Sequence, residues 1–305
     1  MRKISQSQPG RREYHQAMAE MQFRYVDIPG ARLHCATTGP SDGPLVVLLH
    51  GFPQFWYSWH RIAPKLADAG FFVLAPDQRG YNLSSKTGPY TFAALTRDVV
   101  ALIRSQGRER AHIVGHDWGG AVAWAVASAF PERVDRLGVI NLPHLKAFLA
   151  AGLSGNLAQI GKSYYIGVIQ IPRLPEAALS ANQFLGLKRA LTTTSLPGTF
   201  TDDDLKRYVS AWAKPGALRA MLGWYRAVPA QIARRQLEPY TRSIEAPTLV
   251  LFGEKDVALD VRVAVDGMRH VPNGRLVRFA ENTHWLPDER PDEVAALLLE
   301  HFATR

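Results

Sequence analysis

The 305-residue sequence predicts an α/β fold in which a mostly parallel, doubly wound sheet is interrupted by a helical insertion. Short and nearly continuous apolar runs, typical of parallel strands that are covered on both faces, alternate with segments of helical periodicity. Residues 143–233 break this alternation, and it then resumes and continues to the C-terminus. The three observations together favour one large core with an inserted second unit.

The predicted core begins with a hairpin, because FRYVDI and RLHCATT alternate apolar and polar residues around Pro29-Gly30. Apolar runs then predict parallel strands at 45–50, 71–76, 111–116 and 136–141, with helices that include 92–106 and 119–129. After the insertion, strands are predicted at 248–253 and 275–280, followed by the apolar-periodic helix DEVAALLLEHF. The strands and helices alternate as in βαβ units.

The insertion consists of helical pieces punctuated by prolines, namely Pro143, Pro172, Pro175, Pro197 and Pro215. A structureless loop of this length is improbable, so we expect a helical cap over the carboxyl ends of the strands, where ligands bind in such sheets. The expected organisation is an N-terminal arm at 1–22, a core formed by 23–142 and 234–305, and a helical cap at 143–233.

The composition excludes several classes of protein. The formal net charge is +9, but the basic residues are scattered and the densest clusters, Arg11-Arg12 and Arg234-Arg235, are short. We therefore expect a solvated basic surface rather than a nucleic-acid interface. The single cysteine, Cys35, rules out an internal disulfide and a multi-cysteine metal site. Without a secretory signal or an apolar run of membrane-spanning length, we expect a cytoplasmic protein.

The stretch GHDWG, residues 115–119, has the outline of the nucleophile elbow Gly-x-Ser-x-Gly, but Asp117 stands in place of serine. Its glycines allow the backbone to approach closely at a turn from strand to helix. The structural alternative is that Asp117 simply caps a helix. A carboxylate is already anionic at neutral pH, so it suits displacement at a saturated carbon without prior removal of a proton.

Two further polar residues follow predicted strands. Asp256 lies in GEKD directly after 248–253, and His284 lies in ENTHWLP after the last strand. Taken alone, Asp256 could be an ordinary turn residue and His284 an ordinary surface histidine. The order nucleophile, acid, histidine is nevertheless that of the α/β-hydrolase triad. Glu254 and Asp260 are alternative acids on the same loop, with less suitable offsets.

The stretch HGFP, residues 50–53, directly follows the predicted strand 45–50. A turn here can place the backbone N–H of Phe52 beside that of Trp118 and form an oxyanion hole, although it also reads as a plain turn. We expect the substrate pocket to include His50, Phe52, Pro53, Trp118 and Leu142.

From about Phe23 to the C-terminus the sequence resembles the epoxide hydrolases of the α/β-hydrolase fold that carry a helical cap. The motifs that carry this resemblance are HGFPQFWYSW, APDQRGYNLSS, GHDWGGAVAW, YYIGVIQIP, KPGALRAMLGWYR, GEKD and THWLPDERP. The resemblance implies that Asp117 is the nucleophile, Asp256 the charge-relay acid and His284 the base.

The resemblance also implies that two cap tyrosines hold the epoxide oxygen. The matching residues are Tyr165 and Tyr225 of GWYR. Tyr164 remains an alternative to Tyr165, because Gly167 and Val168 replace aromatic residues that are common in the family.

The implied reaction converts an epoxide, apolar or aromatic rather than acidic, and water into a vicinal diol through an alkyl ester on Asp117. It needs no cofactor and no metal, and the resemblance also implies a cis Phe52–Pro53 bond. We expect a monomer or a homodimer. A haloalkane dehalogenase is the nearest alternative, although Phe52 stands where many dehalogenases have asparagine. A non-catalytic binding protein on the same scaffold is another, but it has no need of Asp256.

Overall fold

The computed structural model describes residues 21–153, 157–162 and 164–303. The expected arm, 1–22, therefore lies outside the described residues except at its end. Met21 is buried and Gln22 is the first residue of β1, so the core begins slightly before the expected boundary at Phe23.

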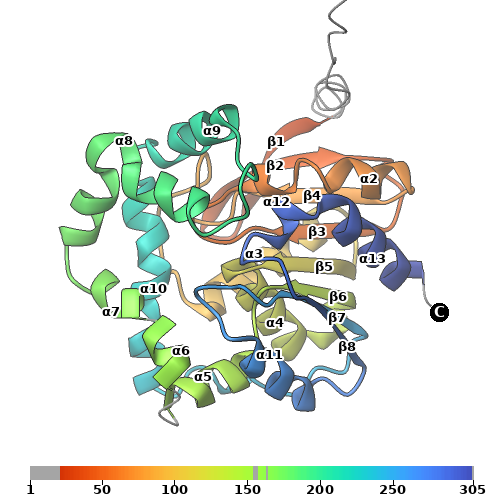
Figure 1. Cartoon of the computed structure of the whole chain (residues 1–305). Coiled ribbons are helices and arrows are strands. Elements are labelled where there is room, and N and C mark those ends of the chain that lie inside the picture. Colours follow the sequence, from red (N-terminus) through yellow and green to blue (C-terminus); the bar gives the residue numbers. More distant parts are fainter. Residues whose placement is uncertain (1–20, 154–156, 163, 304–305) are drawn as a thin grey trace, which may run out of the picture.

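Eight strands of the described chain form a single sheet in the order β1-β2-β4-β3-β5-β6-β7-β8 (Figure 1). β1 and β2 are antiparallel to their neighbours, and the remaining strands are parallel. The strands are β1 (Gln22–Ile28), β2 (Ala31–Thr38), β3 (Leu45–Leu49), β4 (Phe72–Pro76), β5 (Ala111–His116), β6 (Val134–Ile140), β7 (Thr248–Gly253) and β8 (Gly274–Phe279). The eight predicted strands are confirmed; β6 starts two residues before its predicted start at residue 136.

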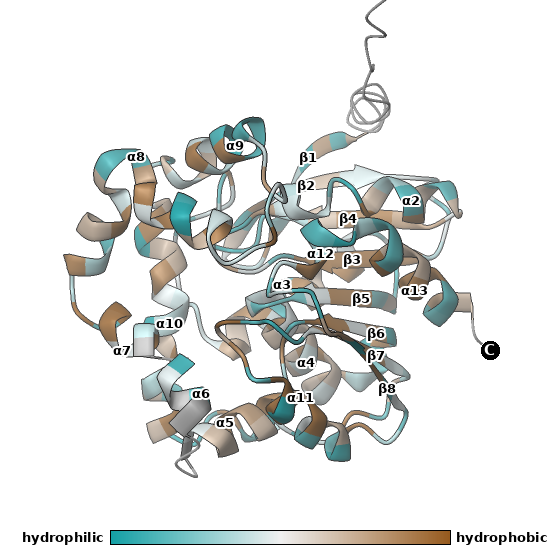
Figure 2. Ribbon diagram, viewed as in Figure 1, coloured by the Kyte–Doolittle hydropathy of each residue, from teal (hydrophilic) through white to brown (hydrophobic). Residues whose placement is uncertain are grey.

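Helices cover both faces of the sheet, which explains why β3, β4 and β7 are buried along their whole length. α3 and α4 pack together, as do α2 and α13. In Figure 2 the central strands are coloured mostly as hydrophobic, whereas surface helices such as α9 and α11 contain both hydrophilic (teal) and hydrophobic (brown) residues. The helices of the core are η1 (Trp56–Trp59), α2 (Ala63–Asp68), α3 (Phe92–Ser105), α4 (Trp118–Ala129), η2 (Pro131–Arg133), η3 (Glu238–Tyr240), α11 (Val261–Gly267), η4 (Met268–His270), α12 (Leu286–Glu289) and α13 (Pro291–Ala303).

The segment between β6 and β7 is helical and lies to one side of the sheet (Figure 1). Its helices are α5 (Leu145–Leu153), α6 (Leu157–Lys162), α7 (Tyr164–Ile169), α8 (Leu174–Thr192), α9 (Asp202–Trp212) and α10 (Ala217–Ala233). The backbone leaves the helical conformation within α8, at Ala181–Phe184. We propose that 143–233 is the cap, and we use that name for these helices below.

A buried ion pair fastens the loop after β4 to α3. Arg79 Nε lies 2.7 Å from Asp98 Oδ2, and Arg79 Nη2 lies 2.6 Å from Asp98 Oδ1. Trp224 of the cap helix α10 donates its indole N–H to the carbonyl of Arg79 at 2.9 Å. The pair therefore also supports a contact between the core and the cap.

Replacing Asp98 by alanine should leave the Arg79 guanidinium buried without its counter-ion. We expect the free energy of unfolding in urea to fall by about 3–5 kcal/mol. The control is Asp27→Ala, which removes the exposed ion pair with Arg32 and should cost less than about 1 kcal/mol. Equal losses in the two variants would contradict the assignment of a structural role to the Arg79–Asp98 pair.

Candidate active site

Asp117 lies on a sharp turn between β5 and α4, with φ 52° and ψ −122°. A residue other than glycine adopts this backbone conformation only under strain, and such strain is concentrated at functional sites. A Cβ on Gly119 would lie 2.0 Å from the carbonyl oxygen of Leu49, so the close packing of the turn requires glycine there. Although Asp117 occupies the N-cap of α4, its side chain makes no capping hydrogen bond, and the helix-cap alternative is therefore wrong.

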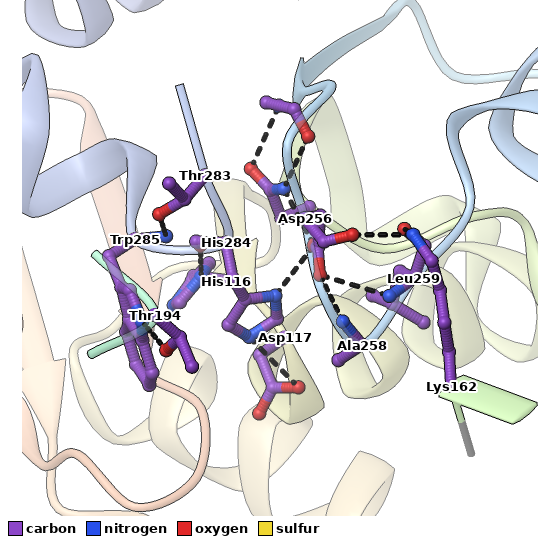
Figure 3. Close-up of polar contacts among 12 residues, drawn as sticks. His116, Asp117, Lys162, Thr194, Asp256, Ala258, Leu259, Thr283, His284 and Trp285 are labelled. Carbon is purple, nitrogen blue, oxygen red and sulfur yellow. Dashed lines mark hydrogen bonds and ion pairs between the residues drawn. The ribbon is translucent and has the colours of Figure 1, made fainter. Parts of the chain in front are cut away.

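The structure brings together three residues that the sequence analysis selected (Figure 3). His284 Nδ1 lies 2.7 Å from Asp256 Oδ2, and His284 Nε2 lies 3.5 Å from Asp117 Oδ2. The two alternative acids point elsewhere, because Glu254 pairs with Arg278 and Asp260 pairs with Arg262. Asp256 is therefore the acid that orients His284.

The Asp256 carboxylate is buried and accepts hydrogen bonds at both oxygens. The backbone N–H groups of Ala258 and Leu259 donate to Oδ1 at 2.7 Å and 2.9 Å. Asn141 Nδ2 donates to Oδ2 at 2.8 Å, beside the bond from His284. Asn141 was not among the residues predicted from the sequence; the available signal is an asparagine at the carboxyl end of β6, where polar residues reach the ligand side of the sheet.

The site is organised around a buried positive charge. Burial alone would lower the pKa of His284, but the charges and hydrogen bonds of Asp256 and Asp117 outweigh it and raise that pKa to about 10. Burial raises the pKa of each carboxyl, but the interactions with His284 outweigh it and hold both values below the usual range. At neutral pH the side chains form a carboxylate–imidazolium–carboxylate arrangement.

Asp117 Oδ1 accepts the backbone N–H of Phe52 at 2.7 Å. A hydrogen bond from the backbone N–H of Trp118 also lowers the pKa of Asp117. The Phe52–Pro53 peptide bond is cis, as expected. A Cβ at Gly51 would lie 2.4 Å from the Asp117 side chain, so the HGFP turn approaches the carboxylate with its backbone alone.

Asp117 faces a cavity of about 640 Å³, part of which is open to solvent. Among the described residues that line it, Asp117 alone carries a charge, and the walls are mostly aliphatic and aromatic side chains. Trp118 and Leu142, which were expected at the substrate pocket, line this cavity. Two tyrosines from the cap, Tyr165 and Tyr225, line the same cavity.

The prediction that His50, Phe52 and Pro53 line the pocket is wrong for the cavity observed. His50 lies beneath the turn, where its ring bonds to the carbonyl of Gly51 and the N–H of Gln78. The Phe52 ring packs against Tyr225, and the Pro53 carbonyl accepts the Trp212 indole N–H. The turn thus contacts the cap through the Phe52 ring and the Pro53 carbonyl, and it contacts the carboxylate through the Phe52 N–H.

Tyr165 of α7 and Tyr225 of α10 lie next to each other, with ring centroids 5.9 Å apart. Burial, together with the negative charge of Asp117, raises the pKa of both phenols, so both are protonated at neutral pH. The side chain of the alternative residue, Tyr164, lies outside the described residues. The structure therefore places two phenolic donors and one carboxylate on the same cavity.

Comparison with known proteins agrees with this geometry. The family model described as alpha/beta hydrolase fold matches residues 44–291. The chain is 35% identical to epoxide hydrolase 4 of Mus musculus over 286 residues, covering 90% of this chain and 77% of the relative. The chain belongs to the epoxide hydrolase family of the alpha/beta hydrolase fold.

Other members of the family match almost end to end. The AB hydrolase superfamily protein YfhM of Bacillus subtilis (strain 168) is 41% identical over 288 residues, which cover 93% of this chain and 99% of that protein. The structure of Bacillus megaterium epoxide hydrolase in complex with an inhibitor superimposes with a TM-score of 0.83 at 27% identity. That match covers 92% of this hydrolase and 100% of the bacterial chain.

Two kinds of structural element are absent from the described part of this hydrolase. None of its helices combines the length and the apolarity that crossing a bilayer requires. No group of three or more His, Cys, Asp and Glu side chains among the described residues is arranged to hold a metal ion.

The pKa of His284 should depend on the charge of Asp117. In Asp117→Asn one of the two neighbouring anions is lost, and we expect the pKa of His284 to fall below about 10. NMR titration of the imidazole nitrogens measures this, and His284→Gln identifies the signal by its disappearance. An unchanged titration in Asp117→Asn would show that the two side chains do not interact.

Proposed function

We propose that this protein hydrolyses epoxides to vicinal diols through a covalent alkyl ester on Asp117. The single observation that supports this most is a buried carboxylate that shares one cavity with two phenols and also contacts a histidine–aspartate pair. The relatives named as epoxide hydrolases support the same reaction class.

In the first step Asp117 Oδ2, which is not held by the Phe52 N–H, attacks a ring carbon of the epoxide. A C–O bond of the ring breaks, and the electron pair moves onto the ring oxygen. Tyr165 and Tyr225 donate hydrogen bonds to that oxygen, and these bonds strengthen as negative charge develops. Because an alkoxide is far more basic than a phenolate, a phenol then transfers its proton to it.

Formation of the ester prepares the second step. It removes the negative charge of Asp117, and the pKa of His284 then falls because only Asp256 still stabilises the imidazolium. The phenolate left by the first step takes up the proton that His284 releases, and the phenol is restored. His284 thereby becomes a neutral base only after the ester has formed.

In the second step His284 removes a proton from water, and the resulting hydroxide attacks the carbonyl carbon of the Asp117 ester. The N–H of Phe52 holds the oxyanion at the position of Oδ1, and the N–H of Trp118, which also donates to the Asp117 side chain, assists it. Cleavage of the acyl C–O bond expels the diol oxygen as an alkoxide, which takes the remaining proton of the added water. This releases the diol, regenerates the Asp117 carboxylate and leaves His284 protonated again. Atoms and charges balance without a cofactor.

The lining of the cavity supports an apolar substrate. Phe92, Leu145, Phe148 and Val228 contribute aliphatic and aromatic surface, and no basic side chain among the described lining residues is available to pair with a substrate carboxylate. A charged substrate would lose its hydration without compensation in such a site. We therefore propose an uncharged epoxide with an apolar or aromatic substituent.

The covalent ester is directly testable. In His284→Gln, incubation with styrene oxide should add the mass of one epoxide to the protein, located on Asp117 by peptide mapping, because ester formation does not need a base but ester hydrolysis does. The control is Asp117→Asn/His284→Gln, which should gain no mass. Absence of the adduct with a range of epoxides would overturn the proposed function, and turnover of 1-bromobutane instead would favour a haloalkane dehalogenase.

The role of the phenols is tested separately. Tyr225→Phe removes one hydrogen bond to a developing charge. It should weaken transition-state stabilisation by about 1.5–3 kcal/mol, which lowers kcat/KM roughly 10- to 150-fold. Tyr165→Phe/Tyr225→Phe should lose more, because no donor to the ring oxygen remains. The control is Tyr25→Phe on the exposed strand β1, which should leave kcat/KM unchanged. Full activity in the double variant would mean that the cap tyrosines do not activate the epoxide.

A further inference from the structure

The loop that carries Asp256 is held from the cap. We call residues 254–260 the acid loop. Lys162, at the end of α6, directs its ammonium group at this loop, where it donates to the carbonyls of Asp256 and of Leu259, the latter at 2.9 Å (Figure 3). Gln159 of the same helix donates to the carbonyl of Ala258 at 3.0 Å and accepts the N–H of Asp260 at 3.0 Å.

These contacts involve the same peptide groups that orient the Asp256 carboxylate. The carbonyl of Ala258 and the N–H of Leu259 belong to one planar peptide unit. Gln159 binds that unit at its oxygen, and Asp256 Oδ1 accepts from it at its nitrogen, 2.9 Å away. A movement of Gln159 therefore rotates a donor of the charge-relay carboxylate.

The next peptide unit is held at both ends. Lys162 donates to the carbonyl of Leu259, and Gln159 accepts the N–H of Asp260. Gln159 is 1% exposed, so a movement of the acid loop away from it would break two hydrogen bonds in the interior of the protein. Lys162 contacts main-chain oxygens and not the Asp256 carboxylate, so its effect on Asp256 is one of position.

We propose that Gln159 and Lys162 are positioning residues through which the cap holds Asp256 in place for the hydrolysis of the ester. This inference rests on the proposed function. The two half-reactions should respond differently, because ester formation uses the anionic Asp117 and the phenols, whereas ester hydrolysis uses neutral His284 oriented by Asp256.

Single-turnover measurements with styrene oxide separate the two steps, with the ester quantified by intact mass after rapid quenching. In Lys162→Met and in Gln159→Leu we expect ester formation within about twofold of the native rate and ester hydrolysis slowed about tenfold, which is about 1.4 kcal/mol. The ester should therefore accumulate. The matched control is Lys146→Met on the neighbouring helix α5, an exposed lysine that should leave both rates unchanged.

The pH dependence gives a readout that general destabilisation would not change. A less firmly held Asp256 supports the imidazolium less, so the pH at which ester hydrolysis reaches half its maximum should move to a lower value in Gln159→Leu, which removes no charge. Lys146→Met should keep the native midpoint. Thermal unfolding of each variant establishes that the chain is folded at the assay temperature.

Restoring the ammonium group provides the positive test. Lys162→Cys should show the same slow hydrolysis, and alkylation with 2-bromoethylamine rebuilds a side chain of lysine length and charge at that position. The native Cys35 is fully buried, so the added thiol is the one that reacts. Recovery of ester hydrolysis to within about threefold of the native rate supports the proposal, with the native protein treated in parallel as control.

The outcomes distinguish this inference from the proposed function. A native protein that never forms the ester would overturn both. A native protein that forms it, together with variants that hydrolyse it at the native rate or that lose both half-reactions equally, would overturn the positioning role alone.

Discussion

A carboxylate in an apolar cavity is stable only if donors and an opposite charge replace the water that it has lost. Asp117 has two such sources, the N–H groups of the turns beside it and the imidazolium of His284. His284 in turn depends on Asp256, which takes hydrogen bonds from its own loop and from Asn141. The rest of the site follows from the need to keep these buried charges paired.

Because of this dependence, the protonation state of His284 should change when Asp117 becomes an ester. In the resting state the imidazolium is the charge that lets both carboxylates remain ionised. Once one carboxylate becomes an ester, the same histidine has one anion beside it instead of two, and it favours the neutral form. In the proposed mechanism His284 thus first stabilises the nucleophile as an anion and then acts as a base.

The sequence predicted what depends on local pattern and chain order. The strands are apolar runs, and Asp117, Asp256 and His284 each follow a strand, so a parallel sheet brings them to one edge. It did not predict which side of the HGFP turn faces the cavity, and His50 was therefore misplaced. Gln159 and Lys162 reach the acid loop across about a hundred positions of chain, and nothing in local spacing reveals such a contact.

The glycines around Asp117 are positions where the sequence cannot vary without a clash, whereas the side chains that line the cavity can be replaced more readily. At Gly51, Gly115 and Gly119 an added methyl group would meet neighbouring atoms within 2.4 Å, so these positions beneath the nucleophile do not tolerate a larger residue. The opposite wall is built by cap side chains such as Phe148, Ile166 and Val228, which carry no such restriction. Changes in substrate preference or enantioselectivity are therefore expected at lining side chains of the cap and of the core, such as Val228 and Leu142, and not at these glycines.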